Sequence, residues 1–445
     1  MILDGIKVVD LTHAVAGAFA ARWLADMGAD VVKVERFGGD RTRASGLEEF
    51  EDGSVVPAFG TANTELGAMG GMFLFANAGK KSVCVDFAVP EGLDIVKRLI
   101  AEADVVTENF TPGVLAKWGL SYADLTAIKP NIIMCSVSGF GADAPDPHRP
   151  CTEPVAMAMS GFSHMVGEPD GYPLTDGTGI GDPVTGTIGA LGIVSALFHR
   201  ERTGEGQRVD VCLLDSAFAM DTTVLPFVAT TRGRFKPSRS GPETGFSSPY
   251  GIFKAKNGYI AMMAGGFGEG SAWSRFVRLI GREELLHHPD WATTEARRNR
   301  SGAVRELIET YLQATYPDPE SAADALGAAG IVAGPVLTPN EAINHPHYVR
   351  RKMVTECETP FLGSMPVIST PIKFSATEAR ASRGSFLGEG NEAVLADWLE
   401  MSHADLDQLY ECGAIEHDTL IDALRANGEL PDPWGTTEES GAAVS

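Results

Sequence analysis

The first half of the chain alternates short apolar, β-branched runs with segments whose apolar residues recur at helical spacing. The pattern predicts strands at 7–11, 30–34, 82–86, 105–107 and 132–136, with helices at 17–27 and 91–101. A helix that follows one strand and precedes the next is typical of a crossover between parallel strands. We therefore expect an α/β fold with a large, Rossmann-like domain built on an open, mostly parallel sheet.

The later pattern indicates a second domain. A nearly uncharged helical run at 183–200 is followed by a strand at 209–213, and then by a stretch rich in Arg, Ser, Gly and Pro that is typical of a linker. Strand signals and helical stretches then return. We expect the N-terminal part of the large domain at 1–225, a linker at 226–245, a smaller α+β domain at 246–332, a return segment at 333–430 that completes the large domain from the other chain end, and a disordered tail at 431–445.

Charge and composition exclude several classes of protein. The chain of 445 residues has a formal net charge of −23, whereas nucleic-acid binding needs a basic face. A local cluster of Lys and Arg can still hold a phosphate, because exposed charges are largely screened beyond roughly 8–10 Å. Without a run of about 18 uncharged apolar residues or a signal-like N-terminus, we expect no membrane partner and a cytoplasmic location. The six cysteines lack CxxC spacing, so we expect neither a metal site nor a disulfide framework.

Asp182 is the sharpest candidate for chemistry. It stands between Gly181 and Pro183, just ahead of the long apolar helix. Pro183 fits the first helical position, so we expect Asp182 to be the N-cap, with the helix dipole favouring its ionised form. An ionised carboxylate beside glycines can attack a thioester carbonyl. A plain capping role without chemistry is the alternative, and the local sequence leaves both open.

Gly186, Gly189 and Gly192 recur on one face of the same predicted helix. Each glycine costs a helix roughly 1 kcal/mol relative to alanine, so such a row indicates a close contact with another backbone. That backbone belongs either to another chain or to the same domain.

Candidate phosphate contacts lie where predicted strands end. Arg36 follows the second strand, and Asn109 follows the strand at 105–107. Ligands of doubly wound sheets bind at such carboxyl ends. Taken singly, each residue could equally be a solvated surface or turn residue. The first turn, residues 12–18, lacks the GxGxxG pattern, which disfavours a dinucleotide-dependent dehydrogenase.

Seven segments in order carry a wider resemblance: residues 3–12 (LDGIKVVDLT), 24–35 (LADMGADVVKVE), 108–113 (ENFTPG), 138–141 (SGFG), 200–210 (RERTGEGQRVD), 334–336 (GPV) and 371–375 (PIKFS). With them, the chain resembles the class III CoA-transferase (CaiB/BaiF) family over roughly residues 3–395. The resemblance implies transfer of CoA from an acyl-CoA to a small carboxylic acid, no permanently bound cofactor, and a homodimer of interlocked chains.

The resemblance also implies a set of site residues. The nucleophile falls on Asp182, and an acidic residue near the active site falls on Glu153, which we take as a second catalytic candidate. No metal is implied. The implied CoA contacts are Val15, Ala16, Arg36, Lys80, Asn109, Phe110, Lys117, Ser138, Gly139 and Phe140.

Some positions depart from particular branches of the family. Formyl-CoA transferases often carry Gln and Lys where this chain has Val15 and Ser138, and they have a glycine run that residues 246–250 lack. Formyl and oxalate specificity is therefore not expected; succinyl-CoA is the donor that the family suggests. The catalytic His of the related racemases falls on Thr152, which cannot take up a proton as His does. An acyl-CoA racemase or isomerase and a non-catalytic CoA-ester binding protein are the alternatives.

Overall fold

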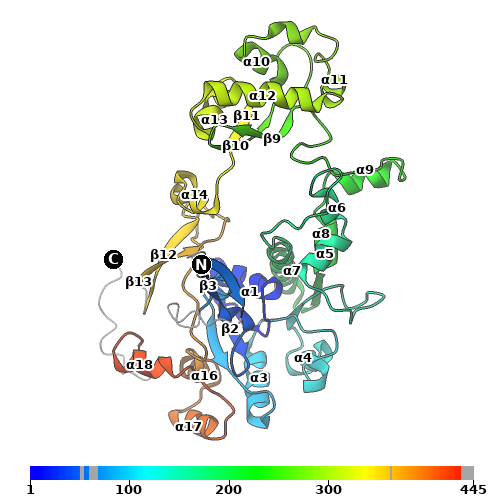
Figure 1. Ribbon diagram of the computed structural model, residues 1–445. Coiled ribbons are helices and arrows are strands. Elements are labelled where there is room, and N and C mark those ends of the chain that lie inside the picture. Colours follow the sequence, from blue (N-terminus) through cyan, green and yellow to red (C-terminus); the bar gives the residue numbers. More distant parts are fainter. Residues whose placement is uncertain (51–54, 60–68, 361–362, 380, 432–445) are drawn as a thin grey trace. The chain divides into compact units, whose positions relative to one another are not determined.

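The computed structural model describes residues 1–50, 55–59, 69–360, 363–379 and 381–431 (Figure 1). It divides into two compact units. Unit 1 is built from Met1–Ser160, Gly177–Met220 and the chain from His347 onward, and unit 2 from Gly161–Asp176 and Asp221–Pro346. The tail predicted at 431–445 lies, apart from Pro431, outside the described residues, and the predicted boundaries of the five segments stay a prediction.

A six-stranded parallel sheet forms the centre of unit 1, so the predicted α/β fold with a parallel sheet is confirmed. Its spatial order is β5-β2-β1-β6-β7-β8, in which every neighbouring pair is parallel. The order reverses between β1 and β6, and doubly wound sheets bind ligands at the carboxyl ends of the strands at such a point. The strands are β1 Lys7–Asp10, β2 Asp30–Glu35, β5 Lys81–Cys84, β6 Val105–Glu108, β7 Ile133–Ser138 and β8 Arg208–Cys212.

Alternating side chains of the sheet build two separate cores, because successive residues of a strand point to opposite faces. Val9 packs in a cluster with residues of α3, α16 and α17, whereas Val8 packs in another with residues of α1 and α7. Helices from the C-terminal part of the chain thus share a core with α3, beside which Figure 1 draws α16. These helices are α1 Ala16–Asp26, α3 Pro90–Glu102, α7 Gly181–Thr203, α16 Asn391–Leu399 and α17 His403–Glu411.

Shorter elements complete unit 1. Two antiparallel hairpins pair β3 with β4 and β12 with β13. Helix α15 begins at the last residue of unit 2 and ends in unit 1. The elements are η1 Arg41–Ala44, β3 Ser45–Glu49, β4 Val55–Phe59, α2 Gly71–Asn77, η3 Leu115–Trp118, α4 Tyr122–Ile128, α5 Glu153–Met159, α8 Leu213–Ala219, α15 Pro346–Arg350, β12 Val354–Thr359, β13 Gly363–Ile368 and α18 Leu420–Ala426.

The glycine row of α7 packs inside unit 1. A Cβ atom on Gly186 would lie 2.5 Å from the carbonyl oxygen of Ala16, and one on Gly192 would lie 2.6 Å from Cγ1 of Val209. The row therefore lets α7 approach α1 and β8 closely. Of the two contacts that the sequence left open, with another chain or within the same domain, the structure shows the second. By length and composition α7 could also cross a membrane, but packed core helices share both properties.

Unit 2 holds a three-stranded antiparallel sheet, in the order β11-β10-β9, covered by helices. Its core includes Phe253 of β9, Trp273 of α10 and Ile308 of α12, all buried. The small antiparallel sheet with helices agrees with the predicted α+β character. The elements are α6 Phe162–Met165, α9 Val224–Thr230, β9 Tyr250–Ala255, β10 Gly258–Met263, α10 Ala272–Leu279, η4 Glu283–Leu286, α11 Thr294–Arg298, α12 Ser301–Thr315, α13 Pro319–Ala328, β11 Val332–Pro335 and α14 Pro339–Ile343.

Candidate active site

A cavity of about 700 Å³ opens at the carboxyl ends of the central strands of unit 1. It lies at the point where the strand order reverses, so it occupies the place at which this fold binds ligands. The segments that follow β1, β2, β5 and β6 supply its walls: Leu11, Thr12, His13, Ala14, Val34, Glu35, Arg36, Gly39, Asp40, Arg41, Asp86, Phe87, Ala88, Phe110 and Trp118.

Asn109 joins the segments after β1 and β6. Its Oδ1 accepts a hydrogen bond from the His13 backbone N–H at 2.9 Å, and its Nδ2 donates to the His13 carbonyl oxygen at 2.6 Å. The imidazole of His13 lies edge-on to Phe110, with 4.7 Å between ring centroids, and Phe110 meets Trp118 at 5.7 Å. His13 and Trp118 were missed by the sequence reasoning. The sequence signal for His13 was its position just after the first predicted strand, as Asn109 follows the strand at 105–107.

The predicted basic contacts fall in three different places. Arg36 is exposed and lines the cavity. Lys117 is exposed on η3 and is not among the residues that line it, although its neighbour Trp118 is. Of the three lysine and arginine contacts implied by the resemblance, only Arg36 is thus at the cavity; the third, Lys80, is internal.

Lys80 is buried, and its ammonium is fully used inside the domain. Its Nζ donates to Asp10 Oδ2 at 2.7 Å, to the Ala18 carbonyl at 2.7 Å and to Asn77 Oδ1 at 2.8 Å. An ammonium has three donors, so none remains for a phosphate. The expected contact of Lys80 with CoA is therefore corrected: this lysine ties α1 and α2 to β1.

The start of α1 faces the same region. Val15 is the N-cap and forms no side-chain capping bond, and Ala14 before it has a positive φ of 59°. The first N–H groups of a helix have no intrahelical acceptor, and together with the helix dipole they attract anions. A Cβ atom on Gly17 would come within 3.0 Å of Asn109 Cβ, so the glycine lets the helix start approach the Asn109 bridge.

Asp182 lies at the start of α7, but it is not the N-cap. The N-cap is Ile180, and Gly181 is the first residue of the helix. The Gly181 N–H donates to Glu153 Oε1 at 3.2 Å, and a Cβ atom on Gly181 would lie 2.8 Å from Glu153 Cγ. The carboxylate of Glu153 therefore serves this helix terminus, which leaves the side chain of Asp182 outside the capping bond.

Burial, and after it the charge of Glu153, raises the pKa of Asp182 to about 6. The expectation that the helix start favours the ionised form is thus corrected, because desolvation and a second carboxylate outweigh the dipole. Asp182 is still mostly ionised at pH 7 to 8. A carboxylate with a raised pKa is also a stronger base and nucleophile than an ordinary aspartate.

The loop after β7 lies beside the Glu153 segment. A Cβ atom on Gly139 would come within 2.3 Å of Cys151 Cβ, so a side chain at that position has no room. Ser138 Oγ accepts from the Gly141 N–H at 2.9 Å, and the Arg149 guanidinium lies 5.6 Å from the Phe140 ring centroid. Burial raises the pKa of the Cys151 thiol, and the negative charge of Asp182 contributes to the same shift.

The structure thus gathers the predicted residues into two neighbouring groups. Arg36 and Phe110 line the cavity, and Asn109 and the start of α1 lie next to its lining residues His13 and Ala14. Asp182 and Glu153 lie with the segment 138–140. The contact between Gly186 and Ala16 connects them, since Gly186 is one turn after Asp182. Across the described ranges, no cluster of three His, Cys, Asp or Glu side chains could hold a metal ion.

The sequence and the fold together identify a CoA-transferase. The chain matches CoA-transferase family III over residues 3–385, and it belongs to that family. It is 34% identical to a succinate–glutarate CoA-transferase of Agrobacterium fabrum, over 89% of this chain and 95% of the relative. It is 32% identical to a formyl-CoA:oxalate CoA-transferase of Streptomyces avermitilis, over 93% of this chain and 99% of the relative.

The fold is also that of solved family structures. A CaiB/BaiF family protein from Brucella suis superposes with a TM-score of 0.75 at 32% identity, covering 89% of this chain and 99% of that chain. The family resemblance of the sequence is thereby confirmed, and the chain is an enzyme of this class.

Proposed function

We propose that Asp182 carries CoA from an acyl-CoA donor to a carboxylic acid acceptor. The observation that supports this most is the position of the carboxylate. Asp182 is half-buried, has a pKa raised to about 6, and lies one turn before the residue that contacts Ala16 at the start of α1. The nucleophile is thus placed on a helix that packs against α1, whose start adjoins the cavity at the carboxyl ends of the sheet.

The first half of the reaction makes a CoA ester of the enzyme. An Asp182 carboxylate oxygen attacks the acyl carbon of the donor thioester, the C–S bond breaks, and CoA leaves as a thiolate from an acyl-aspartyl anhydride. The thiolate then attacks the Asp182 carboxyl carbon, the anhydride C–O bond breaks, and the donor acid leaves as its carboxylate. Asp182 is now an aspartyl-CoA thioester.

The second half reverses these steps with the acceptor. The acceptor carboxylate attacks the Asp182 carbonyl and expels the thiolate, which gives a new mixed anhydride. The thiolate attacks the acceptor's acyl carbon, and Asp182 is released as a carboxylate. One thioester is exchanged for another, so the net reaction needs no further energy source, but water must be kept from the anhydride.

Other residues bind and position. Arg36 and the N–H groups at the start of α1 suit the phosphates of CoA, and the rings of His13, Phe110 and Trp118 suit its base. Glu153 holds the Gly181 N–H and keeps the pKa of Asp182 raised through its charge. N–H groups at the start of α7 suit the oxyanion that forms on attack.

For the substrates we propose succinyl-CoA as donor and a small carboxylic acid as acceptor. The relative from Agrobacterium fabrum is named for succinate and glutarate, so glutarate is the first acceptor to test. Val15 and Ser138 stand where formyl-CoA transferases often carry Gln and Lys, which speaks against formate and oxalate.

We further propose a cytoplasmic, interlocked homodimer. Helix α7 supports the proposal of a second copy, because its side chains Leu191 and Phe198 are 67% and 64% exposed. Large apolar side chains left exposed on a helix favour cover by another chain. Light scattering on the purified protein tests the dimer.

Two alternatives are separated from this proposal by simple assays. A racemase or isomerase would exchange the α-proton of an acyl-CoA in deuterated water without an acceptor acid. At the position of the racemase histidine stands Thr152, the N-cap of α5, whose hydroxyl is a poor base. A CoA-ester binding protein would bind CoA without turnover.

The direct test is a transfer assay with succinyl-CoA and a panel of mono- and dicarboxylic acids. We expect acceptor-dependent formation of a new acyl-CoA, and a loss of at least a thousandfold in Asp182→Ala and Asp182→Asn. Substantial turnover in both variants, with the fold intact, would contradict the role of Asp182.

A further inference from the structure

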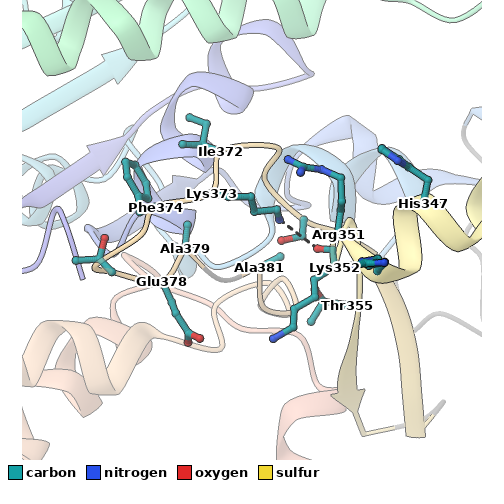
Figure 2. Close-up of a pocket in the computed structure, with 13 residues that line it drawn as sticks. His347, Arg351, Lys352, Thr355, Ile372, Lys373, Phe374, Glu378, Ala379 and Ala381 are labelled. Carbon is teal, nitrogen blue, oxygen red and sulfur yellow. Dashed lines mark hydrogen bonds between the residues drawn. The ribbon is translucent and has the colours of Figure 1, made fainter.

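A second, open cavity of about 870 Å³ lies in the C-terminal part of unit 1 (Figure 2). The end of α15, the turn after it, β12 and the loop that follows β13 form its walls. They contribute His347, Arg350, Arg351, Lys352, Thr355, Ser369, Ile372, Lys373, Phe374, Thr377, Glu378, Ala379 and Ala381. The cavity shares no lining residue with the one at the carboxyl ends of the sheet.

Positive charge is concentrated in this cavity. Four of its lining side chains are lysine or arginine, and Glu378 is the one carboxylate among them. The whole chain, by contrast, has 36 Lys and Arg against 59 Asp and Glu. A local field of this sign on an acidic protein attracts anions, because distant charges are screened by salt.

Within the described ranges, no ion pair neutralises these cations. In the part of the chain that the structure describes, the side chains of Arg350, Arg351 and Lys352 form no hydrogen bond or ion pair. Lys373 donates to the carbonyl oxygens of Thr370 at 2.9 Å and Lys352 at 3.4 Å, which are uncharged acceptors. Burial lowers the pKa of Lys373, and the positive charges of Arg351 and Lys352 lower it further. An anion of two or more charges would relieve the repulsion between these cations.

The shape of the cavity adds an apolar side. Figure 2 shows Ile372 and Phe374 on one side and Arg351, Lys352 and His347 on the other. Thr355, Ser369 and Thr377 also line it. Its volume is in the range of small-molecule sites, and arginine and lysine together are typical phosphate ligands.

We propose that this cavity binds a small phosphate-bearing ligand, with Arg351 and Lys352 as its main phosphate contacts. The site is separate from the proposed CoA site, as the course of α1 shows. Its first turn faces the cavity at the sheet, whereas Arg22 near its end donates to the carbonyl of Ile368, next to Ser369. Arg22 is six residues after Ala16, which corresponds to about 9 Å along a helix.

The test is calorimetric titration of the full-length protein, saturated with CoA, with inorganic pyrophosphate. We expect binding that weakens as salt is raised. The double variant Arg351→Ala/Lys352→Ala should bind pyrophosphate at least tenfold more weakly. The matched control, Lys254→Ala/Lys256→Ala, removes the same charge from exposed positions in unit 2 and should bind as the wild type does. Circular dichroism checks that both variants fold.

A second titration, with GTP, distinguishes the form of the ligand. Equal affinity for the two probes means that the phosphates alone are recognised, whereas tighter binding of GTP means that the apolar side also takes part; both require Arg351 and Lys352. The proposal is overturned if neither probe binds, if CoA displaces them, or if the cavity variant binds as tightly as the control. Failure of CoA transfer would leave this result unaffected, because the two sites share no residue.

Discussion

The backbone of Gly186 lies directly against the carbonyl oxygen of Ala16, at a distance that leaves no room for a side chain: a Cβ atom there would be 2.5 Å from the oxygen. The contact joins the second turn of α7 to the first turn of α1. Asp182 precedes Gly186 by one turn, and Ala16 begins the helix whose start faces the cavity. The proposed nucleophile is therefore positioned by helix packing in the interior of unit 1.

Gly186→Ala tests this packing. The added methyl would also lie 2.8 Å from Phe19 Cβ, so α7 must shift away from α1. Overpacking of this kind costs about 1–3 kcal/mol of unfolding free energy, and transfer activity should fall with it. Urea unfolding measures the first effect. Gly327→Ala in α13, where a Cβ meets nothing within 4 Å, is the control and should gain up to about 1 kcal/mol. Equal stabilities of the two variants would be inconsistent with the packing.

The raised pKa of Asp182 predicts an acid limb in the rate profile. The nucleophile must be ionised, so kcat/KM should fall about tenfold per pH unit below about pH 6 and level off above it. A profile that stays flat down to pH 4.5 would show that another group limits the reaction.

The variant Glu153→Gln separates burial from the charge of Glu153, the two causes of the raised pKa of Asp182. The amide keeps an oxygen that can accept from the Gly181 N–H but loses the charge beside Asp182. The acid limb should therefore move to lower pH, while part of the elevation persists because burial is its larger cause. An unmoved limb would contradict the charge effect of Glu153.

Asp182→Asn should make the protein more stable at neutral pH. Raising the pKa from 3.8 to about 6 means that the folded state disfavours the charge. At about 1.4 kcal/mol per unit, discounted for a half-buried side chain, the gain is about 1–2 kcal/mol. The gain is full above pH 6 and disappears as the pH falls toward 3.8, since wild-type Asp182 is then protonated in the folded state. Unfolding free energies of both proteins at pH 8 and pH 4 measure it; a gain that grows at pH 4 has the wrong sign.

Asn109 is a positioning residue for the cavity. Asn109→Ala removes both hydrogen bonds to the His13 backbone, so the affinity for CoA should fall about tenfold, corresponding to about 1.4 kcal/mol. Asn109→Asp keeps the acceptor for the His13 N–H and should lose less. Titration with CoA measures both variants, and an unchanged affinity in the alanine variant would exclude the bridge from CoA binding.

Much of the fold follows from local patterns. The strands and the helix predicted at 91–101, which is α3, were predictable because hydrophobic periodicity is a property of neighbouring residues. The site was less predictable, because its chemistry depends on residues far apart in the chain. Nothing near Asp182 in sequence indicates that Glu153 takes the Gly181 N–H, and nothing near Lys80 indicates that Asp10 and Asn77 enclose its ammonium. The basic cavity likewise forms only when Lys373 folds beside Arg351 and Lys352.

The central claim is a covalent bond between CoA and the carboxyl group of Asp182, and trapping it is the most direct measurement. The enzyme is mixed with succinyl-CoA without an acceptor, treated with hydroxylamine, digested and analysed by mass spectrometry. We predict a hydroxamate on the peptide that contains Asp182, and before hydroxylamine an intact mass raised by one CoA minus one water. A transfer-competent enzyme whose Asp182 peptide stays unmodified, or a modification that persists in Asp182→Asn, would contradict the account.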